Sequence, residues 1–171
     1  MFDKTDILES LLDEIRIVKH LATKVPAGAW DFRPTEGQRS ILETLRYLAF
    51  CGMGGAQSMV DGNFDGYHKW CASTENMSAE DIPAALDRQA EAMRELFDSF
   101  SNEDFHNKVA KHPMGHELPL GRALLEVPLK WMVGYRMQLF LFLKEAGASE
   151  LVTPNCWGGV DPAPAVDCSQ N

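Results

Sequence analysis

Apolar side chains recur at helical spacing along four long stretches of the chain, and the longest of these runs from residue 120 to residue 147. Its stripe repeats at alternating steps of four and three residues, which at 3.6 residues per turn falls on one side of a helix. The stripe consists of Leu124, Pro128, Trp131, Tyr135, Gln138 and Phe142. We therefore predict a core-facing helix that Pro128 bends near its start and that Gly147 ends.

Three further amphipathic stretches predict three more helices. The first covers residues 3–24, the second runs from Ser40 to about Val60, and the third begins at Ser78. Ser40 and Ser78 are each followed three residues later by an acidic residue, which is typical of the capping box at a helix start. The second helix contains several glycines, which allow close approach of a neighbouring helix. The pattern as a whole predicts an all-α four-helix bundle with long crossover connections.

Proline, glycine and polar residues fill the stretches between these helices and predict connectors. The connectors are residues 25–38, 61–77 and 101–119, and the last of them has room for a short extended piece. We expect one domain over residues 1–150, followed by an irregular C-terminal tail over residues 151–171. Trp157 is the expected anchor of this tail, whose last residues are predicted to be mobile.

Composition excludes several classes of partner. The 171 residues include 16 basic and 25 acidic side chains, a formal net charge of -9, and no cluster of lysine or arginine. Nucleic acid is excluded as a partner because phosphate neutralisation needs a basic face. No apolar run has the length of a membrane span, and the first ten residues lack the pattern of a signal peptide, so we expect a cytoplasmic protein with no membrane partner. The four cysteines are widely separated, which favours reduced thiols.

Three short motifs resemble the DinB-like family, which includes the YfiT-type and mycothiol-dependent enzymes. They are Trp30, Arg33 and Pro34 in the first connector, Ser40, Ile41 and Glu43 at the second helix start, and Arg136, Gln138 and Leu139 in the last helix. The resemblance covers the chain from Leu8 to Gly147. It implies a four-helix bundle with two crossovers, often a homodimer, and a divalent metal held by one histidine of the second helix and two of the fourth.

The metal ligands that the resemblance implies are missing from this chain. The three histidine positions are occupied by Tyr47, Trp131 and Tyr135. Tryptophan has no lone pair for a metal, and neutral tyrosine is a poor ligand for zinc or nickel. We therefore expect no metal and no cofactor at this position, with aromatic rings filling or lining the cavity instead.

Other candidate ligands and nucleophiles are weaker. His112 and His116 have the spacing of a helical metal pair, but the proline and glycine among them favour a loop. His20 lies roughly opposite the apolar arc of the first helix, so we expect it in solvent. Cys51 lies one turn beyond Tyr47 and faces the same region, where an inert buried thiol is the simpler interpretation.

The aromatic stripe leaves two structural interpretations open. The rings either pack as core, or their hydroxyls and the Gln138 amide line a pocket, since buried polar groups need partners. Arg136 lies off the stripe and is expected to pair with Glu43 or another acid. The residues assigned to the candidate ligand site are Tyr47, Cys51, Trp131, Tyr135 and Gln138.

Three functions are compatible with these residues. The first is a metal-free DinB-like protein, either a small-molecule binding bundle or a degenerate enzyme, that uses the aromatic cavity. The second is a metal-dependent thiol-transferase-like or hydrolytic enzyme with non-standard ligands such as His112 and His116. The third is a structural or interaction role as a homodimer. We favour the first.

Overall fold

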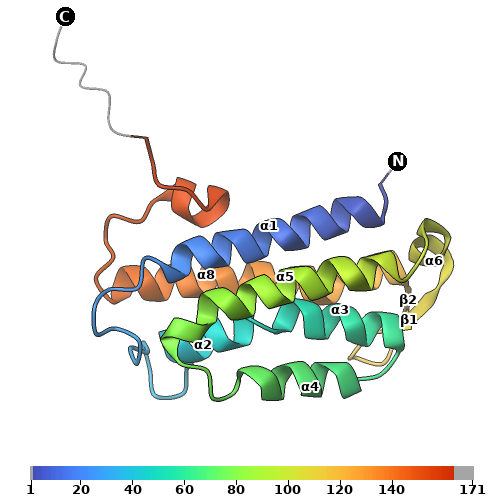
Figure 1. The fold of residues 1–171 in the computed structure, drawn as a ribbon, viewed down its shortest axis with the longest axis horizontal. Helices are drawn as coiled ribbons and strands as arrows, with labels where there is room; N and C mark the ends of the chain where they lie inside the picture. Colours follow the sequence, from blue (N-terminus) through green and yellow to red (C-terminus); the bar gives the residue numbers. More distant parts are fainter. Residues whose placement is uncertain (1, 164–171) are drawn as a thin grey trace, which may run out of the picture.

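The computed structural model describes residues 2–163 and has the all-α bundle architecture that the hydrophobic pattern predicts (Figure 1). Its helices are α1 (Lys4–Ala22), α2 (Ile41–Leu48), α3 (Cys51–Asp61), α4 (Asp65–Thr74), α5 (Ile82–Asp98), α6 (Asn102–Asn107), α7 (Leu120–Leu124) and α8 (Lys130–Glu145). The strands β1 (Val109–Lys111) and β2 (Glu117–Pro119) form one small antiparallel hairpin. None of the helices in this part of the chain is long and apolar enough to cross a membrane.

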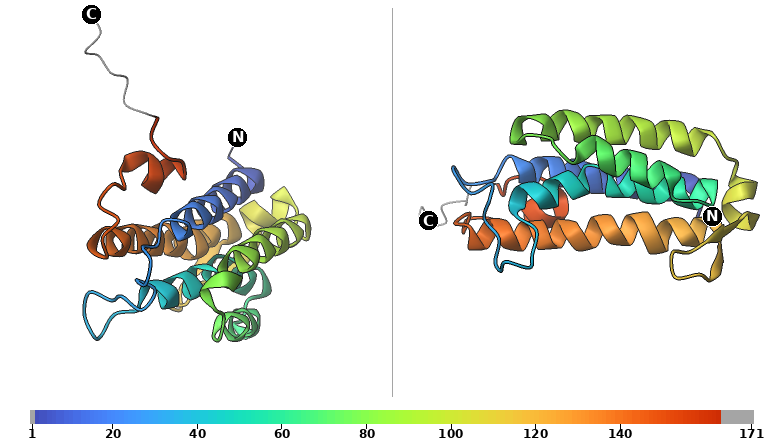
Figure 2. Two further views of the ribbon diagram at one scale, coloured as in Figure 1. Left: turned by 60° about the vertical axis from the view of Figure 1, so that its left-hand side comes forward. Right: turned by 90° about the horizontal axis from the view of Figure 1, so that it is seen from below.

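Four long rods make up the bundle: α1, α2 with α3, α5, and α7 with α8 (Figure 2). α1 packs against α5 and α8, while α3 packs against α5 and α2 packs against α8. The α2–α3 rod and α5 run in the same direction, so the chain must return along the bundle between them (Figure 1). α4 makes this return and packs on α3. The four-helix bundle with a long crossover is therefore confirmed.

Two predicted connectors contain regular structure that the sequence analysis missed. Residues 61–77 include α4, in which only Thr74 is fully buried, so the segment lacks the apolar stripe that marks a core helix. Residues 101–119 include α6 and the β1–β2 hairpin, whose strands account for the predicted extended piece. Short elements of this kind are stabilised by contacts with the rest of the fold, so the hydrophobic periodicity of their own sequence does not reveal them.

Capping boxes fix the starts of the second and third rods, as predicted. The Ser40 hydroxyl accepts the Glu43 amide hydrogen, and the Glu43 carboxylate accepts the Ser40 amide hydrogen at 2.7 Å. Ser78 and Asp81 form the same reciprocal pair. These contacts satisfy amides that would otherwise have no partner in the first turn, which explains why the helix starts could be identified from local sequence.

The second helix is interrupted, although the sequence predicts one continuous helix to about Val60. α2 ends at Leu48 and α3 begins at Cys51, with Phe50 outside helical geometry between them. The buried Gln89 amide of α5 bridges the gap: its Nε2 donates to the Leu48 carbonyl at 2.9 Å and its Oε1 accepts from the Met53 amide at 3.1 Å. The interruption therefore leaves no unsatisfied backbone group at these two positions.

The glycines of α3 provide the close helix contacts expected of them. A Cβ atom at Gly54 would lie 3.1 Å from the Tyr67 ring of α4, and one at Gly55 would lie 3.3 Å from the Trp131 ring of α8. Both distances are shorter than ordinary van der Waals contact between carbon atoms. The absence of side chains at these two positions therefore brings Tyr67 and Trp131 toward the same region of α3.

Pro128 interrupts the last rod between α7 and α8. Residues Leu125–Leu129 form a wide π-type turn, which accommodates the proline ring and its missing amide hydrogen. Pro128 therefore interrupts the regular α-helix near its start, while the bend itself stays a prediction.

The predicted core stripe is right at its two ends, where Leu124, Pro128 and Phe142 are buried, and wrong in its middle part. Met132, Arg136, Leu139 and Leu143 are fully buried, whereas Trp131, Tyr135 and Gln138 are only half-buried. Arg136 donates to the Glu14 carboxylate of α1 from Nε at 2.5 Å and from Nη2 at 3.3 Å. The expected pairing with an acid is confirmed, and of the two alternatives the acid is Glu14 rather than Glu43, which lies 3.3 Å from Arg33. The prediction treated the charged Arg136 as lying outside the core, so in this part of α8 the predicted core face is off by one residue.

The C-terminal segment packs on α1 and α8, and its residues Pro154–Gly158 form one helical turn rather than wholly irregular tail (Figure 2). The Cys156 carbonyl accepts a hydrogen bond from Arg136 Nη1 at 2.7 Å. Trp157 contributes a ring 4.5 Å from the same guanidinium, but more than half of its surface is exposed. Arg136 therefore anchors the segment together with Arg16, which donates to the Gly158 carbonyl at 2.9 Å. The domain boundary at residue 150 stays a prediction, and the tail's last residues lie outside those described.

His20 does not face solvent as expected. Its side chain is 15% exposed, and its Nε2 lies 3.1 Å from the Asn155 side-chain nitrogen. Burial, followed by the nearby Lys24 charge, lowers the His20 pKa. The C-terminal segment covers this part of α1, which helical periodicity of α1 alone does not reveal.

We predict that Arg136→Met destabilises the fold by about 3–5 kcal/mol, because it leaves the Glu14 carboxylate without its partner between two helices. Urea denaturation measures the free energy of unfolding. Arg94→Met is the matched control, since Arg94 is half-exposed and within the described residues pairs only with Glu91, at 3.5 Å. Its loss is expected to cost no more than about 1 kcal/mol. A double variant, Glu14→Leu with Arg136→Met, should regain part of the lost stability. Equal effects of the two arginine substitutions would contradict the assigned role of the pair.

Candidate functional site

An aromatic cluster lies where α2, α4 and α8 meet. The Tyr47 and Tyr135 rings are in contact, with centroids 4.4 Å apart, and Phe50 lies 5.2 Å from Tyr47. Tyr67 of α4 connects the two sides, at 5.3 Å from Phe50 and 6.0 Å from Trp131. The edge-to-face and tilted geometries are those that aromatic pairs favour. The three positions at which the family resemblance places histidines therefore belong to one set of packed rings.

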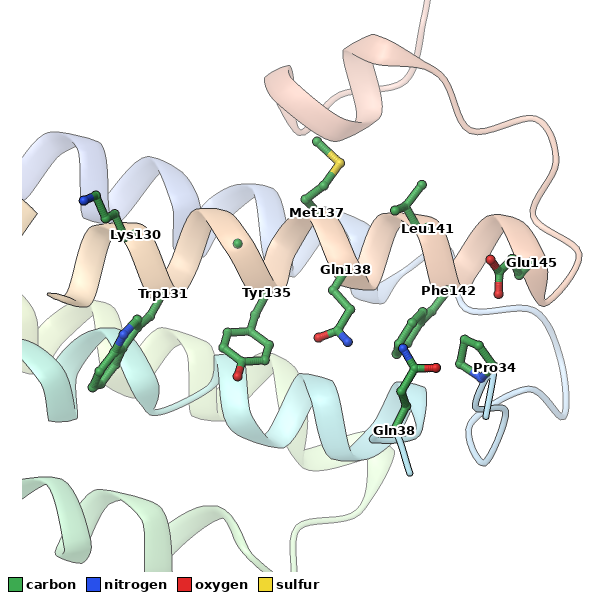
Figure 3. Close-up of a pocket in the computed structure, with 11 residues that line it drawn as sticks. Pro34, Gln38, Lys130, Trp131, Tyr135, Met137, Gln138, Leu141, Phe142 and Glu145 are labelled. Carbon is green, nitrogen blue, oxygen red and sulfur yellow. The ribbon is translucent and has the colours of Figure 1, made fainter. Parts of the chain in front are cut away.

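A groove runs along the exposed side of α8 and has a volume of about 680 Å³. We call it the α8 groove. Figure 3 shows Trp131, Tyr135, Gln138 and Phe142 projecting from the same side of the helix, with Gln38 and Pro34 of the first connector beside Phe142. Lys130 and Glu145 lie at its two ends (Figure 3). Most of the exposed lining is apolar.

A second hollow, the α2–α4 pocket, has a volume of about 330 Å³. It is lined by Arg39, Glu43, Arg46, Tyr47, Phe50, Tyr67, Cys71, Thr74 and Glu75. Tyr135 lines the α8 groove and Tyr47 lines this pocket, so the contact between the two rings separates the hollows. The single aromatic cavity expected from the sequence is thus two adjacent spaces.

Arg39 is a residue of this region that the sequence analysis did not identify. Its guanidinium carbon lies 4.4 Å from the Tyr47 ring centroid and 5.3 Å from that of Tyr135. Such contacts between a cation and aromatic faces are attractive. The signal in the sequence is weak, because Arg39 is one exposed residue before a helix start and one of its two partners, Tyr135, is distant in sequence.

The structure brings together most of the predicted site residues but excludes one. Trp131, Tyr135 and Gln138 line the α8 groove, and Tyr47 touches Tyr135 from the other hollow. Cys51 lines neither hollow: it is fully buried, with its sulfur 3.5 Å from the Met132 sulfur. The prediction that Cys51 faces the same region as Tyr47 assumed one continuous helix. The structure has a break after Leu48, which lies between Tyr47 and Cys51.

Burial sets the ionisation of the site. It raises the pKa of the Cys51 thiol and of the Tyr47 and Tyr67 hydroxyls, because the charged forms lose hydration. These groups are therefore neutral near pH 7 and act as hydrogen-bonding or apolar surfaces rather than as nucleophiles.

The donor set at the family's metal position does not fit a divalent ion. Two neutral phenols and an indole offer no imidazole or carboxylate, and the Arg39 guanidinium already places a positive charge against both tyrosine rings. His112 and His116 do come together in the β1–β2 turn, with ring centroids 4.3 Å apart. Within residues 2–163, however, no group of three histidine, cysteine, aspartate or glutamate side chains is arranged to hold a metal.

The fold and the position of the candidate site together indicate the class of protein. It is a bundle of four helical rods with a crossover helix, and its candidate site lies between the second and last rods. The sequence profile of the DinB superfamily matches residues 11–127, and the chain belongs to this superfamily. The match ends before α8, so the assignment of Trp131 and Tyr135 to ligand positions depends on the motif resemblance alone.

Comparison with solved structures supports the same fold. The crystal structure of the DinB-like protein YjoA from Bacillus subtilis has a TM-score of 0.67 at 19% identity, covering 86% of this chain and 96% of that one. A comparison with curated proteins finds no significant match.

We predict that iodoacetamide at about pH 8 labels Cys71 in the folded protein while sparing Cys51 and Cys156, because alkylation requires an accessible thiolate. Cys71 is partly exposed, whereas the other two are buried with raised pKa values. Mass spectrometry resolved to single peptides measures labelling at each position. Labelling in urea is the control, where all three should react. Early modification of Cys51 in the folded protein would contradict its inert role.

We also predict metal content far below one ion per chain after incubation with zinc or nickel, because the donor set does not fit these ions. Inductively coupled plasma mass spectrometry of untagged protein measures it. A His112→Ala, His116→Ala variant is the control for weak surface binding by the stacked histidines. One tightly held ion per chain would contradict the metal-free interpretation, and loss of that ion in the control would favour the second function.

Proposed function

We propose that the chain is a metal-free DinB-like protein that binds a small organic molecule in the α8 groove, either as a binding bundle or as a degenerate enzyme. One observation carries the proposal: Trp131, Tyr135 and Gln138 line the groove, and their polar side-chain groups have no hydrogen-bond partners among residues 2–163. Within the same range, Thr44 Oγ1 is the one fully buried side-chain oxygen or nitrogen that lacks a partner. The three groove groups are therefore open to solvent.

The make-up of the groove indicates the kind of molecule. Its volume of about 680 Å³ falls within the range of small-molecule sites, about 300–1,000 Å³. Phe142, Leu141 and the two aromatic rings offer apolar contact, while the indole donates and the Gln138 amide both donates and accepts hydrogen bonds. A flat, mainly apolar molecule with one or two polar groups suits this lining. The homodimer and the cytoplasmic location stay predictions.

We predict that Tyr135→Phe weakens binding of groove ligands by about two- to tenfold, because it removes one hydrogen bond worth about 0.5–1.5 kcal/mol and little packing. Neutral heteroaromatic fragments would be screened by thermal shift, and hits would be titrated by calorimetry. Gln138→Ala should weaken the same hits. Tyr67→Phe is the matched control, since it also removes one hydroxyl but lies in the other hollow. If no fragment stabilises the wild-type protein, or if Tyr67→Phe has the same effect as Tyr135→Phe, the groove is not the binding site.

A further inference from the structure

Arg39 is an exposed cation that is held in place without an anionic partner. Its side chain makes no ion pair and no hydrogen bond within residues 2–163, although five other arginines of this range pair with a carboxylate. Its guanidinium carbon lies 4.4 Å from the Tyr47 ring centroid and 5.3 Å from that of Tyr135. Contact with aromatic rings uses none of the guanidinium N–H groups in a hydrogen bond to an oxygen, so they stay available to an acceptor.

Arg39 also lines the α2–α4 pocket, where its guanidinium has no hydrogen-bond partner within residues 2–163. Arg46, the other arginine of the pocket, donates to the Met77 carbonyl from Nε at 2.7 Å and also from Nη2. Arg46 is thus committed to holding α2 against the segment that precedes α5. The pocket therefore contains one arginine that is held by a backbone carbonyl, Arg46, and one whose donors all lack a partner in the described part of the chain, Arg39.

We infer that Arg39 takes the place of a metal ion as the resident cation of this site, and that it anchors the carboxylate of a small organic acid in the α2–α4 pocket. A guanidinium fork matches a carboxylate with two parallel hydrogen bonds. This second site is distinct from the α8 groove, because the Tyr47–Tyr135 contact lies between the two hollows. It does not depend on occupation of the groove.

The charges of the pocket favour a single negative charge over a phosphate dianion. Glu43 and Glu75 line the pocket together with the two arginines. Glu43 remains ionised, since the Ser40 amide and the Arg33 charge lower its pKa. A dianion would meet the negative charge of two carboxylates, whereas a monocarboxylate matches the Arg39 guanidinium one to one.

The rest of the lining suits a short apolar or aromatic body. Phe50 and the ring edges of Tyr47 and Tyr67 provide apolar contact, and the neutral tyrosine hydroxyls provide hydrogen bonds. A volume of about 330 Å³ is near the lower limit of ligand pockets, which restricts the acid to a small one. Benzoate and phenylacetate are suitable probes, because each has a neutral amide of nearly the same shape.

The first test titrates benzoate and phenylacetate, and then benzamide and phenylacetamide, into the full chain. Two-dimensional ¹H–¹⁵N NMR follows backbone signals, including those of residues 39, 47, 67 and 71. The acids should shift these signals and bind at least about tenfold more tightly than their amides, which corresponds to about 1.4 kcal/mol. Arg39→Gln should remove this preference, whereas Arg39→Lys should keep part of it because the charge remains without the fork. Arg94→Gln, at an exposed arginine distant from the pocket lining, should leave it unchanged.

The second test uses Cys71 as a reporter within the pocket and does not require tight binding. Iodoacetate and iodoacetamide both form a carbon–sulfur bond with the thiolate and release iodide, while the thiol proton passes to the buffer. If Arg39 attracts carboxylates, the ratio of iodoacetate to iodoacetamide rates at Cys71 should fall several-fold in Arg39→Gln and stay constant in Arg94→Gln. Circular dichroism confirms that the variants are folded.

Two results would overturn the inference. One is equal affinity of the acids and their amides in the wild-type protein, and the other is an unchanged rate ratio at Cys71 in folded Arg39→Gln. Neither result bears on the α8 groove, whose test uses neutral fragments and substitutions at Tyr135 and Gln138. If the groove proposal fails, the carboxylate preference of Arg39 is still tested by the acid and amide titrations and by the rate ratio at Cys71.

Discussion

The buried pair between Arg136 and Glu14 determines how the last helix sits in the bundle. The guanidinium is fully buried and reaches the α1 carboxylate with two nitrogens, while its third nitrogen bonds the Cys156 carbonyl. An arginine in the core is tolerated only when its donors are satisfied in this way. α8 must therefore turn the Arg136 face toward α1, and the C-terminal segment must lie across both helices.

This orientation of α8 decides what the site can be. With Arg136 inside, the neighbouring stripe of Trp131, Tyr135 and Gln138 lies at the edge of the core, half-buried and open to the α8 groove. The same rotation brings Tyr135 against Tyr47, and Arg39 lies over both rings. Had the aromatic stripe faced the core, its polar groups would have needed partners inside the protein instead of in a groove.

The sequence predicts the architecture well because its main signals are local. Apolar stripes and the capping boxes at Ser40 and Ser78 depend on neighbours a few residues away, and these features are present in the structure. The errors come from contacts that are distant in sequence. Gln89 of α5 bridges the interruption after Leu48, Glu14 of α1 compensates Arg136, and the segment around Asn155 covers His20. Arg39 was missed for the same reason, since only the fold places it over Tyr47 and Tyr135.

Stability and binding chemistry occupy different faces of the same helix in this bundle. Met132, Arg136, Leu139 and Leu143 hold α8 in the core, whereas the Trp131–Tyr135–Gln138 face is only half-buried and lines the α8 groove. A substitution at Trp131, Tyr135 or Gln138 can change the chemical groups that line the groove without disturbing the buried Arg136–Glu14 pair. This separation gives a physical reason why a chain with 19% identity to YjoA keeps its fold. It also means that family membership fixes the scaffold, while the chemistry of the site must be read from its own side chains: an open guanidinium, two neutral phenols and an indole in place of imidazoles.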